Sequence, residues 1–157
     1  MDQAGLAVIA DLAGRGLVAG AVVIGSPGDG FPAAVAAVQE ASATGPVVIA
    51  VDEEGGTVQR FAALLGELPS AAQMGAMSIG DVRELARERA VAIAALGVTV
   101  NLAPVLDVGS GPGIGARSFS DDPMVVSTHG LAFAEGILAG GLVPVAKHFP
   151  GHGRANA

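Results

Sequence analysis

The sequence predicts an α/β fold in which about four strand-helix units form part of a (β/α)8 barrel of the TIM type. Short apolar runs rich in β-branched residues alternate with Ala-rich stretches of helical periodicity. Strands joined by helical crossovers pair in parallel. Polar residues follow successive apolar runs, and such groups at the carboxyl ends of strands are typical of a barrel active site. An open doubly wound sheet is the alternative, although it usually gathers its ligands at one crevice.

The first half of the chain predicts two helices and two strands. A helix is expected over 4–13, followed by a strand at 21–25. Pro32 begins a second helix, which ends before Gly45. The run 46–51 is continuously apolar, which predicts a strand buried on both faces.

The second half repeats the alternation. Asp81 is expected to cap a helix that ends near Gly97. Strands are expected at 98–106 and 142–147, on either side of a helix from Pro123 to Gly140. Pro144 removes one hydrogen-bond donor from the last strand.

Composition excludes several classes of protein. The net charge of −7 and the pI near 4.7 argue against nucleic acid as a partner, because phosphate binding needs clustered Lys and Arg. The chain has no cysteine, so disulfides and thiolate metal sites are excluded. No apolar run is long enough to suggest a membrane segment, and no signal-peptide pattern opens the sequence, which favours a cytoplasmic location.

The length of the chain falls short of a full barrel. A (β/α)8 barrel needs roughly 250 residues, whereas this chain has 157. We therefore expect residues 1–157 to be a partial barrel domain, cut at both ends. Because such a piece exposes unpaired strand edges, we expect the isolated chain to fold poorly or to self-associate.

The segment "VDEEGGTVQR" (51–60) places three carboxylates and an arginine around a Gly-Gly pair at a strand end. Gly55 and Gly56 permit a positive φ or close backbone approach, as a ligand-binding loop needs. Asp52 can accept hydrogen bonds from two hydroxyls, and Arg60 can donate several. An ordinary polar loop remains the alternative.

Two further segments carry polar groups beside apolar runs. "NLAPVLDV" (101–108) buries Asn101 and Asp107, which must find partners and are expected to hold neighbouring loops. "GSGPGIGARSF" (109–119) superficially resembles a phosphate loop but lacks the Lys-Ser/Thr ending. Arg117 within it is either a ligand-binding side chain or a solvated loop arginine.

The most unusual segment is "KHFPGHG" (147–153), which follows the last expected strand. Lys147 and His148 are expected to donate hydrogen bonds to a neutral polar ligand. His148 and His152 have the spacing of a helical metal pair, but the intervening Pro-Gly makes a helix improbable. His129, in a helical pattern, is expected to be a surface or internally hydrogen-bonded histidine.

Together, "VDEEGGTVQR", "NLAPVLDV", "ARSFSDDP" and "KHFPGHG", in this order, resemble family 3 glycoside hydrolases. The resemblance extends from about residue 15 to the last residue. The Pro-Gly-His of the last block is similar to the β-N-acetylhexosaminidase branch. It implies a partial N-terminal barrel domain of an enzyme that removes terminal non-reducing β-linked N-acetylglucosamine, with a muropeptide or related saccharide as substrate.

The resemblance also implies roles for particular residues. Enzymes of this branch retain anomeric configuration through a covalent intermediate on an aspartate, use a histidine paired with an aspartate as acid/base, and need no metal or organic cofactor. Both catalytic elements are expected downstream of Ala157, because "RANA" stands where the branch has Asp-Ser-His. The expected sugar-binding residues are Asp52, Arg60, Arg117, Lys147 and His148, supported by Glu54, Asp107 and His152.

Three alternatives remain open at this point. One is a family 3 β-glucosidase-like specificity. Another is a non-catalytic sugar-binding remnant, suggested by the missing nucleophile and acid/base. A third is a metal-dependent hydrolase that uses His148, His152 and Asp52.

Overall fold

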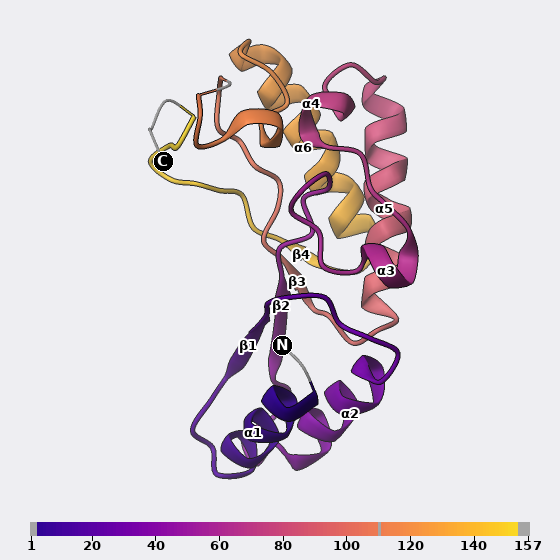
Figure 1. Ribbon diagram of the computed structural model, residues 1–157, viewed down its shortest axis with the longest axis vertical. Coiled ribbons are helices and arrows are strands. Elements are labelled where there is room, and N and C mark those ends of the chain that lie inside the picture. Colours follow the sequence, from indigo (N-terminus) through magenta and orange to yellow (C-terminus); the bar gives the residue numbers. More distant parts are fainter. Residues whose placement is uncertain (1–2, 110, 154–157) are drawn as a thin grey trace.

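A four-stranded parallel sheet organises the chain, with strand order β1-β2-β3-β4 (Figure 1). The computed structural model describes residues 3–109 and 111–153. The strands are β1 (Gly20–Val23), β2 (Val48–Val51), β3 (Val100–Asn101) and β4 (Val143–Pro144), and each pairs in parallel with the next. The predicted α/β class with four parallel strands is confirmed.

Helical segments connect the strands. The long helices are α1 (Gln3–Gly14), α2 (Phe31–Ala41), α5 (Ile79–Ala94) and α6 (Pro123–Ala139), and Figure 1 shows α1 beside α2 and α5 beside α6. Three short elements lie in the connections: α3 (Ala62–Leu65), α4 (Ala71–Met74) and the 3-10 helix η1 (Gly115–Arg117). The sequence pattern did not predict these, because none spans enough residues to show a periodicity.

The helix α5 begins earlier than predicted. Its N-cap is Ser78, whose hydroxyl accepts a hydrogen bond from Asp81 N at 3.1 Å. Asp81, predicted as the cap, instead lies in the first turn, where its charge complements the helix dipole. The helix ends at Ala94, and Gly97 follows it with a φ of 92°.

The last two strands are shorter than the predicted ranges 98–106 and 142–147. Regular pairing covers two residues in each, and beyond it only Val105 and Lys147 form an isolated parallel bridge. Pro104 and Pro144 lack the N–H that a ladder requires, which explains the interruption. Beyond β3 and β4 the two segments are joined by separate backbone hydrogen bonds, from Lys147 N to Pro104 O and from Leu106 N to Lys147 O.

The two faces of the sheet differ in how deeply their side chains are buried. Val23, Ile49 and Val51 are fully buried against the helices. On the opposite face, valines and isoleucine are between 40% and 68% exposed: Val22, Ile24, Val48, Val143 and Val145. The expectation that 46–51 is buried on both faces is thus wrong at Val48, which is 45% exposed, whereas Ala50 on the same face is buried.

Close packing of α5 on α6 completes the helical side. A Cβ at Gly136 or Gly140 would collide with the backbone of α5, so both glycines allow the helices to approach closely. His129 of α6 lies 3.0 Å from Val125 O through Nδ1 and 3.2 Å from Met77 O through Nε2, which confirms it as an internally hydrogen-bonded histidine. No helix among the described residues has the length and apolar character needed to cross a membrane.

Candidate functional site

The segments that follow β2, β3 and β4 meet at the carboxyl ends of the strands. They enclose a cleft of about 460 Å³. All five residues predicted to bind a sugar line it, together with one supporting carboxylate and three apolar side chains: Asp52, Arg60, Arg117, Lys147, His148, Glu54, Val58, Leu102 and Val145. The structure therefore gathers in one place residues that are up to 96 positions apart in the sequence (148 − 52).

Lys147 occupies the centre of this cleft. Its Nζ lies 2.5 Å from Asp52 Oδ1 and 2.5 Å from Glu54 Oε1. Arg60 reaches Asp52 from another side, with Nη2 3.9 Å from Oδ2. Asp52 is thus held between two cations, and it remains partly exposed to the cleft, with 26% of its side chain accessible.

Arg117 is paired with Glu54, from the loop after β2. Its Nε and Nη2 donate to the two oxygens of Glu54 at 2.8 and 2.9 Å, in the bidentate geometry that suits a guanidinium and a carboxylate. The hydrogen bonds to Glu54 raise the pKa of Arg117 above its ordinary value. Arg117 is therefore a fixed cation at the cleft and not the solvated loop residue of the alternative reading.

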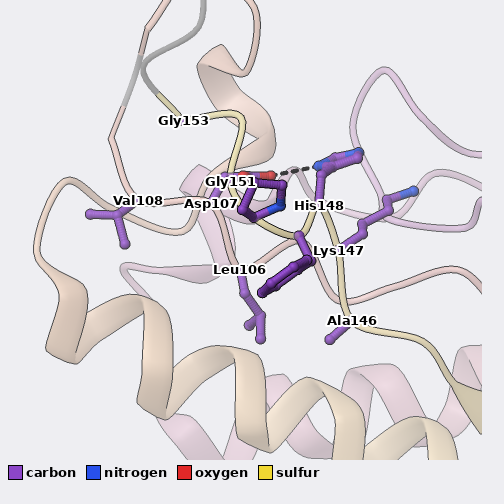
Figure 2. A pocket seen from close by; sticks show the side chains of 10 residues that line it. Leu106, Asp107, Val108, Ala146, Lys147, His148, Gly151 and Gly153 are labelled. Atoms are coloured by element: carbon purple, nitrogen blue, oxygen red, sulfur yellow. Dashed lines mark hydrogen bonds and ion pairs between the residues drawn. The ribbon is translucent and has the colours of Figure 1, made fainter.

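His148 has both ring nitrogens engaged. Nδ1 lies 2.5 Å from Asp107 Oδ2, and Nε2 lies 3.2 Å from Arg117 Nη2. Since the guanidinium can only donate, Nε2 accepts and Nδ1–H donates to Asp107. Figure 2 shows His148 joined to Asp107 while Lys147 extends away from them. The expectation that His148 has a free donor for a ligand is not met in this arrangement.

Asp107 anchors the segment after β4. Its side chain is fully buried, and it accepts hydrogen bonds from the His148 ring and from His152 N. Burial alone raises the pKa of Asp107, but the hydrogen bonds and charge of His148 and the N–H of His152 lower it below its ordinary value overall. The prediction that Asp107 holds a neighbouring loop is confirmed, and His152 contributes through its backbone.

A second cleft, of about 680 Å³, shares Lys147 and His148 with the first (Figure 2). It is lined mainly by the segment 146–153 and by Leu106, Asp107 and Val108. Phe149 stands at this cleft and is 98% exposed. The end of the "GHGRANA" loop, 154–157, lies outside the described residues, as does Ser110 of the glycine-rich segment.

Glycines shape the loop after β2, as the sequence predicted. Gly55 and Gly56 have φ values of 98° and 58°, in the region that side chains disfavour. A Cβ on Gly55 would collide with Pro69 O, and one on Gly56 would crowd Ser70. The loop therefore folds back on the segment before α4. This path of the loop places Glu54 at the cleft.

No role was predicted for Glu53 and Arg89, whose buried side chains hold this loop. Glu53 is completely buried, and its Oε2 accepts from Arg60 N at 2.6 Å and from Phe61 N at 3.3 Å. Arg89 of α5 approaches Glu53 Oε1 with Nη1 at 3.5 Å. The Asn101 side chain makes two hydrogen bonds to the backbone of Glu53. Its Oδ1 accepts from Glu53 N at 3.1 Å and its Nδ2 donates to Glu53 O at 3.0 Å, which confirms the predicted loop-holding role.

A signal for Arg89 is present in the sequence. Val82, Ala86 and Ile93 form the buried stripe of α5, and Arg89 falls on that stripe at helical spacing. A charged residue on a buried stripe requires a partner. No comparable signal marks Glu53, because Asp52 and Glu54 beside it are also acidic.

The side chains of the metal alternative are engaged separately. Asp52 contacts Lys147 and Arg60, whereas the His148 ring donates to Asp107 and His152 donates to it only through its backbone N–H. Within residues 3–109 and 111–153, no three His, Asp or Glu side chains converge as a metal site would require.

Comparisons with known proteins place the chain in a family. Residues 29–157 match the Glycosyl hydrolase family 3 N terminal domain. Beta-hexosaminidase LpqI of Mycobacterium tuberculosis is 41% identical over 144 residues, which is 87% of this chain and 37% of that protein. The crystal structure of a glycosyl hydrolase of the GH3 family from Mycobacterium smegmatis superposes with a TM-score of 0.85 at 39% identity, covering 98% of this chain and 47% of that one.

A third similar structure is that of NagZ from Neisseria gonorrhoeae in complex with N-trifluoroacetyl-D-glucosamine. It has a TM-score of 0.79 and 29% identity, and the match covers 87% of this chain and 44% of that one. The chain thus spans less than half the length of the relatives that it matches. The structural relatives are of the TIM-barrel type, in agreement with the predicted partial barrel. On the family match, the sequence identity and the shared fold, the chain belongs to glycosyl hydrolase family 3.

Proposed function

We propose that the protein containing this chain hydrolyses terminal non-reducing β-linked N-acetylglucosamine with retention of configuration, and that this chain binds the sugar. The observation that carries the proposal is the gathering of Asp52, Arg60, Arg117 and Lys147 around one cleft. Relatives named beta-hexosaminidase, and a relative crystallised with N-trifluoroacetyl-D-glucosamine, support the same sugar. We propose a saccharide or muropeptide with terminal N-acetylglucosamine as the substrate.

The charges of the cleft suit a neutral ligand. Three cations, Arg60, Arg117 and Lys147, line the cleft with two carboxylates, Asp52 and Glu54, and each cation lies beside one of these carboxylates. A sugar hydroxyl both donates and accepts, so it can join such a pair without leaving either charge unpartnered. This pairing favours a sugar over an anionic ligand.

Each side chain has a distinct task in this proposal. Asp52 accepts hydrogen bonds from sugar hydroxyls through its exposed face. Lys147 and Arg60 donate to hydroxyl oxygens, since both cations lie beside Asp52 at the cleft. Arg117 donates to a hydroxyl or acetamido oxygen while Glu54 holds its guanidinium in place. His148 orients Arg117 through Nε2 and is itself oriented by Asp107.

The bond-breaking groups are not assigned to these residues. Glu53 is fully buried, Glu54 is bound to two cations, and Asp107 is covered by His148 and His152. None is free to attack an anomeric carbon. We propose that the nucleophile and the acid/base belong to the remainder of the domain, as the resemblance implies.

The test is hydrolysis of a chromogenic N-acetyl-β-D-glucosaminide by the whole protein, beside the corresponding β-D-glucoside. We expect release of the aglycone from the glucosaminide, and a loss of about 100-fold or more in kcat/KM when Asp52→Asn removes the hydroxyl acceptor. Asp11→Asn, on the exposed surface of α1, is the matched control and should leave kcat/KM unchanged.

Two other results would contradict parts of the proposal. Preferential turnover of the glucoside would contradict the N-acetylglucosamine specificity and support a β-glucosidase-like enzyme. Binding of the sugar without turnover of either substrate would contradict hydrolysis and support the sugar-binding remnant.

A further inference from the structure

We infer that Glu53 and Arg89 form a buried positioning pair that sets Arg60 at the sugar cleft, so that Arg89, which does not touch the ligand, controls sugar affinity. The inference rests on the proposed function for its ligand. It concerns two charged residues that lie beneath the cleft and line no part of it.

The contacts of Glu53 fix the backbone at Arg60. Its Oε2 accepts from Arg60 N at 2.6 Å and from Phe61 N at 3.3 Å. Phe61 is fully buried, so this end of the loop is attached to the core as well. With its backbone fixed, Arg60 extends its guanidinium towards Asp52.

Arg89 closes the same loop from α5. Its Nη1 faces Glu53 Oε1 at 3.5 Å, and its Nη2 donates to Gly66 O at 2.7 Å. One side chain therefore links the two ends of the segment 53–66, which contains Gly55, Gly56 and Arg60. The cation also opposes the effect of burial, which raises the pKa of Glu53 above its ordinary value.

A buried ion pair is weak evidence for a role in stability alone, because an apolar pair of similar volume often serves as well. The placement of this pair points to another use. Neither Glu53 Oε1 nor Arg89 Nη1 makes a hydrogen bond in the described part of the chain, while the opposite oxygen of Glu53 holds Arg60 and Phe61. One carboxylate oxygen is aimed at the loop backbone, and Arg89 faces the other and orients the group.

The test is a double-mutant cycle in the whole protein that contains this chain, with N-acetylglucosamine, which has no glycosidic bond to cleave, as the probe and Kd measured by NMR titration. We expect Arg89→Met and Arg60→Met each to raise Kd about tenfold or more, and the double variant to bind no more weakly than Arg60→Met alone. Arg89→Lys, which retains the cation, should restore at least part of the affinity. Arg83→Met, on the exposed side of the same helix, should not change Kd.

Two results would overturn the inference. One is an Arg89→Met variant that binds like the parent protein, and the other is a double variant whose loss equals the product of the single losses. A purely structural role would lower the folded fraction without this non-additivity. If Arg89→Met does not fold, the same cycle is run with Arg89→Lys, for which we expect a loss of about threefold, again absent in the Arg60→Met background.

Amide hydrogen exchange separates this inference from the proposed function. If the parent protein binds no probe, the proposed function fails, and the pair is judged by the exchange of Arg60 and Phe61 in Arg89→Met. Exchange about tenfold faster at these amides, with Lys147 N–H unchanged, supports positioning. Equal exchange in the variant and the parent contradicts it.

Discussion

Two loops supply most of the cleft, and they are held in different ways. The β2 loop (52–61) is supported from beneath by Glu53, Arg89 and Asn101, all of them buried. The β4 loop (145–153) carries Phe149, which is 98% exposed, and beyond Lys147 its main side-chain anchor is Asp107. The first loop is therefore built into the core, whereas the second is held at the cleft by Asp52 and Glu54 through Lys147 and, beyond Lys147, by Asp107.

The difference follows from the paths that the two loops take after their strands. Lys147 is attached to the strand beside it by backbone hydrogen bonds, from Leu106 N at 2.7 Å and to Pro104 O at 3.1 Å. Beyond that residue the β4 loop leaves the sheet, because the ladder ends there. The β2 loop instead turns back into the helical layer. Substitutions beneath the first loop should therefore cost more stability than substitutions in the second.

The largest expected effect comes from Glu53→Ala. It leaves the buried Arg89 cation without a carboxylate partner and removes the acceptor for two backbone N–H groups, which should lower the free energy of unfolding by about 3–5 kcal/mol. Urea unfolding measures this. Glu67→Ala, at an exposed position, is the control and should change stability by less than about 0.5 kcal/mol. A loss from Glu53→Ala as small as that of the control would contradict the claim that the buried Glu53 and Arg89 hold this loop.

A pair of glycine substitutions compares the two loops directly. Gly55→Ala forces a Cβ against Pro69 O at a positive φ, and we expect a loss of about 3 kcal/mol. Gly151→Ala, in the β4 loop, has a φ of 144° but nothing within 4 Å of the new Cβ, so we expect about 1 kcal/mol. Thermal or urea unfolding of both variants checks the order. Equal losses of stability in the two variants would contradict the difference in packing between the β2 and β4 loops.

Asp107→Asn tests, through pH, the carboxylate that holds the β4 loop beyond Lys147. The pKa of Asp107 is lowered in the folded protein, so its ionised form stabilises the fold above the ordinary carboxyl pKa. That contribution is lost as the pH falls through the lowered pKa. We expect Asp107→Asn to cost about 1–2 kcal/mol at neutral pH and much less near pH 2, measured by urea unfolding. A loss independent of pH would show that charge is not the cause.

The smallest effect is expected at Phe149. Because its side chain is 98% exposed, Phe149→Ala should change the free energy of unfolding by less than about 0.5 kcal/mol. Phe61→Ala, which empties a fully buried position in the β2 loop, should cost about 3–5 kcal/mol. Similar losses for the two phenylalanines would contradict the comparison of the loops.

Much of the arrangement follows from sequence pattern. The apolar runs predict the order of strands, and the polar residues after them predict which side chains meet at the carboxyl ends. Pattern could not predict where β3 and β4 end, because that depends on which backbone groups Pro104 and Pro144 leave unpaired. It also could not separate Glu53 from Asp52 and Glu54, since only the folded chain shows which of three neighbouring carboxylates turns away from the cleft.

Pairing within the cleft also required the structure. Lys147 and His148 are adjacent and predicted to act alike, yet Lys147 joins two carboxylates while His148 lies between Asp107 and Arg117. Their directions depend on the path of the chain after β4, which no periodicity encodes. Which side chains meet in the cleft was predictable, and how they pair with one another there was not.

The most direct test of the account is an NMR titration of this chain with methyl N-acetyl-β-D-glucosaminide and, separately, with methyl β-D-glucoside. We expect saturable binding of the first, weaker binding of the second, and loss of both in Asp52→Asn, with shifts at Asp52, Arg60 and Lys147. Absence of binding by a folded chain, or binding that survives Asp52→Asn unchanged, would contradict the assignment of this cleft to the sugar.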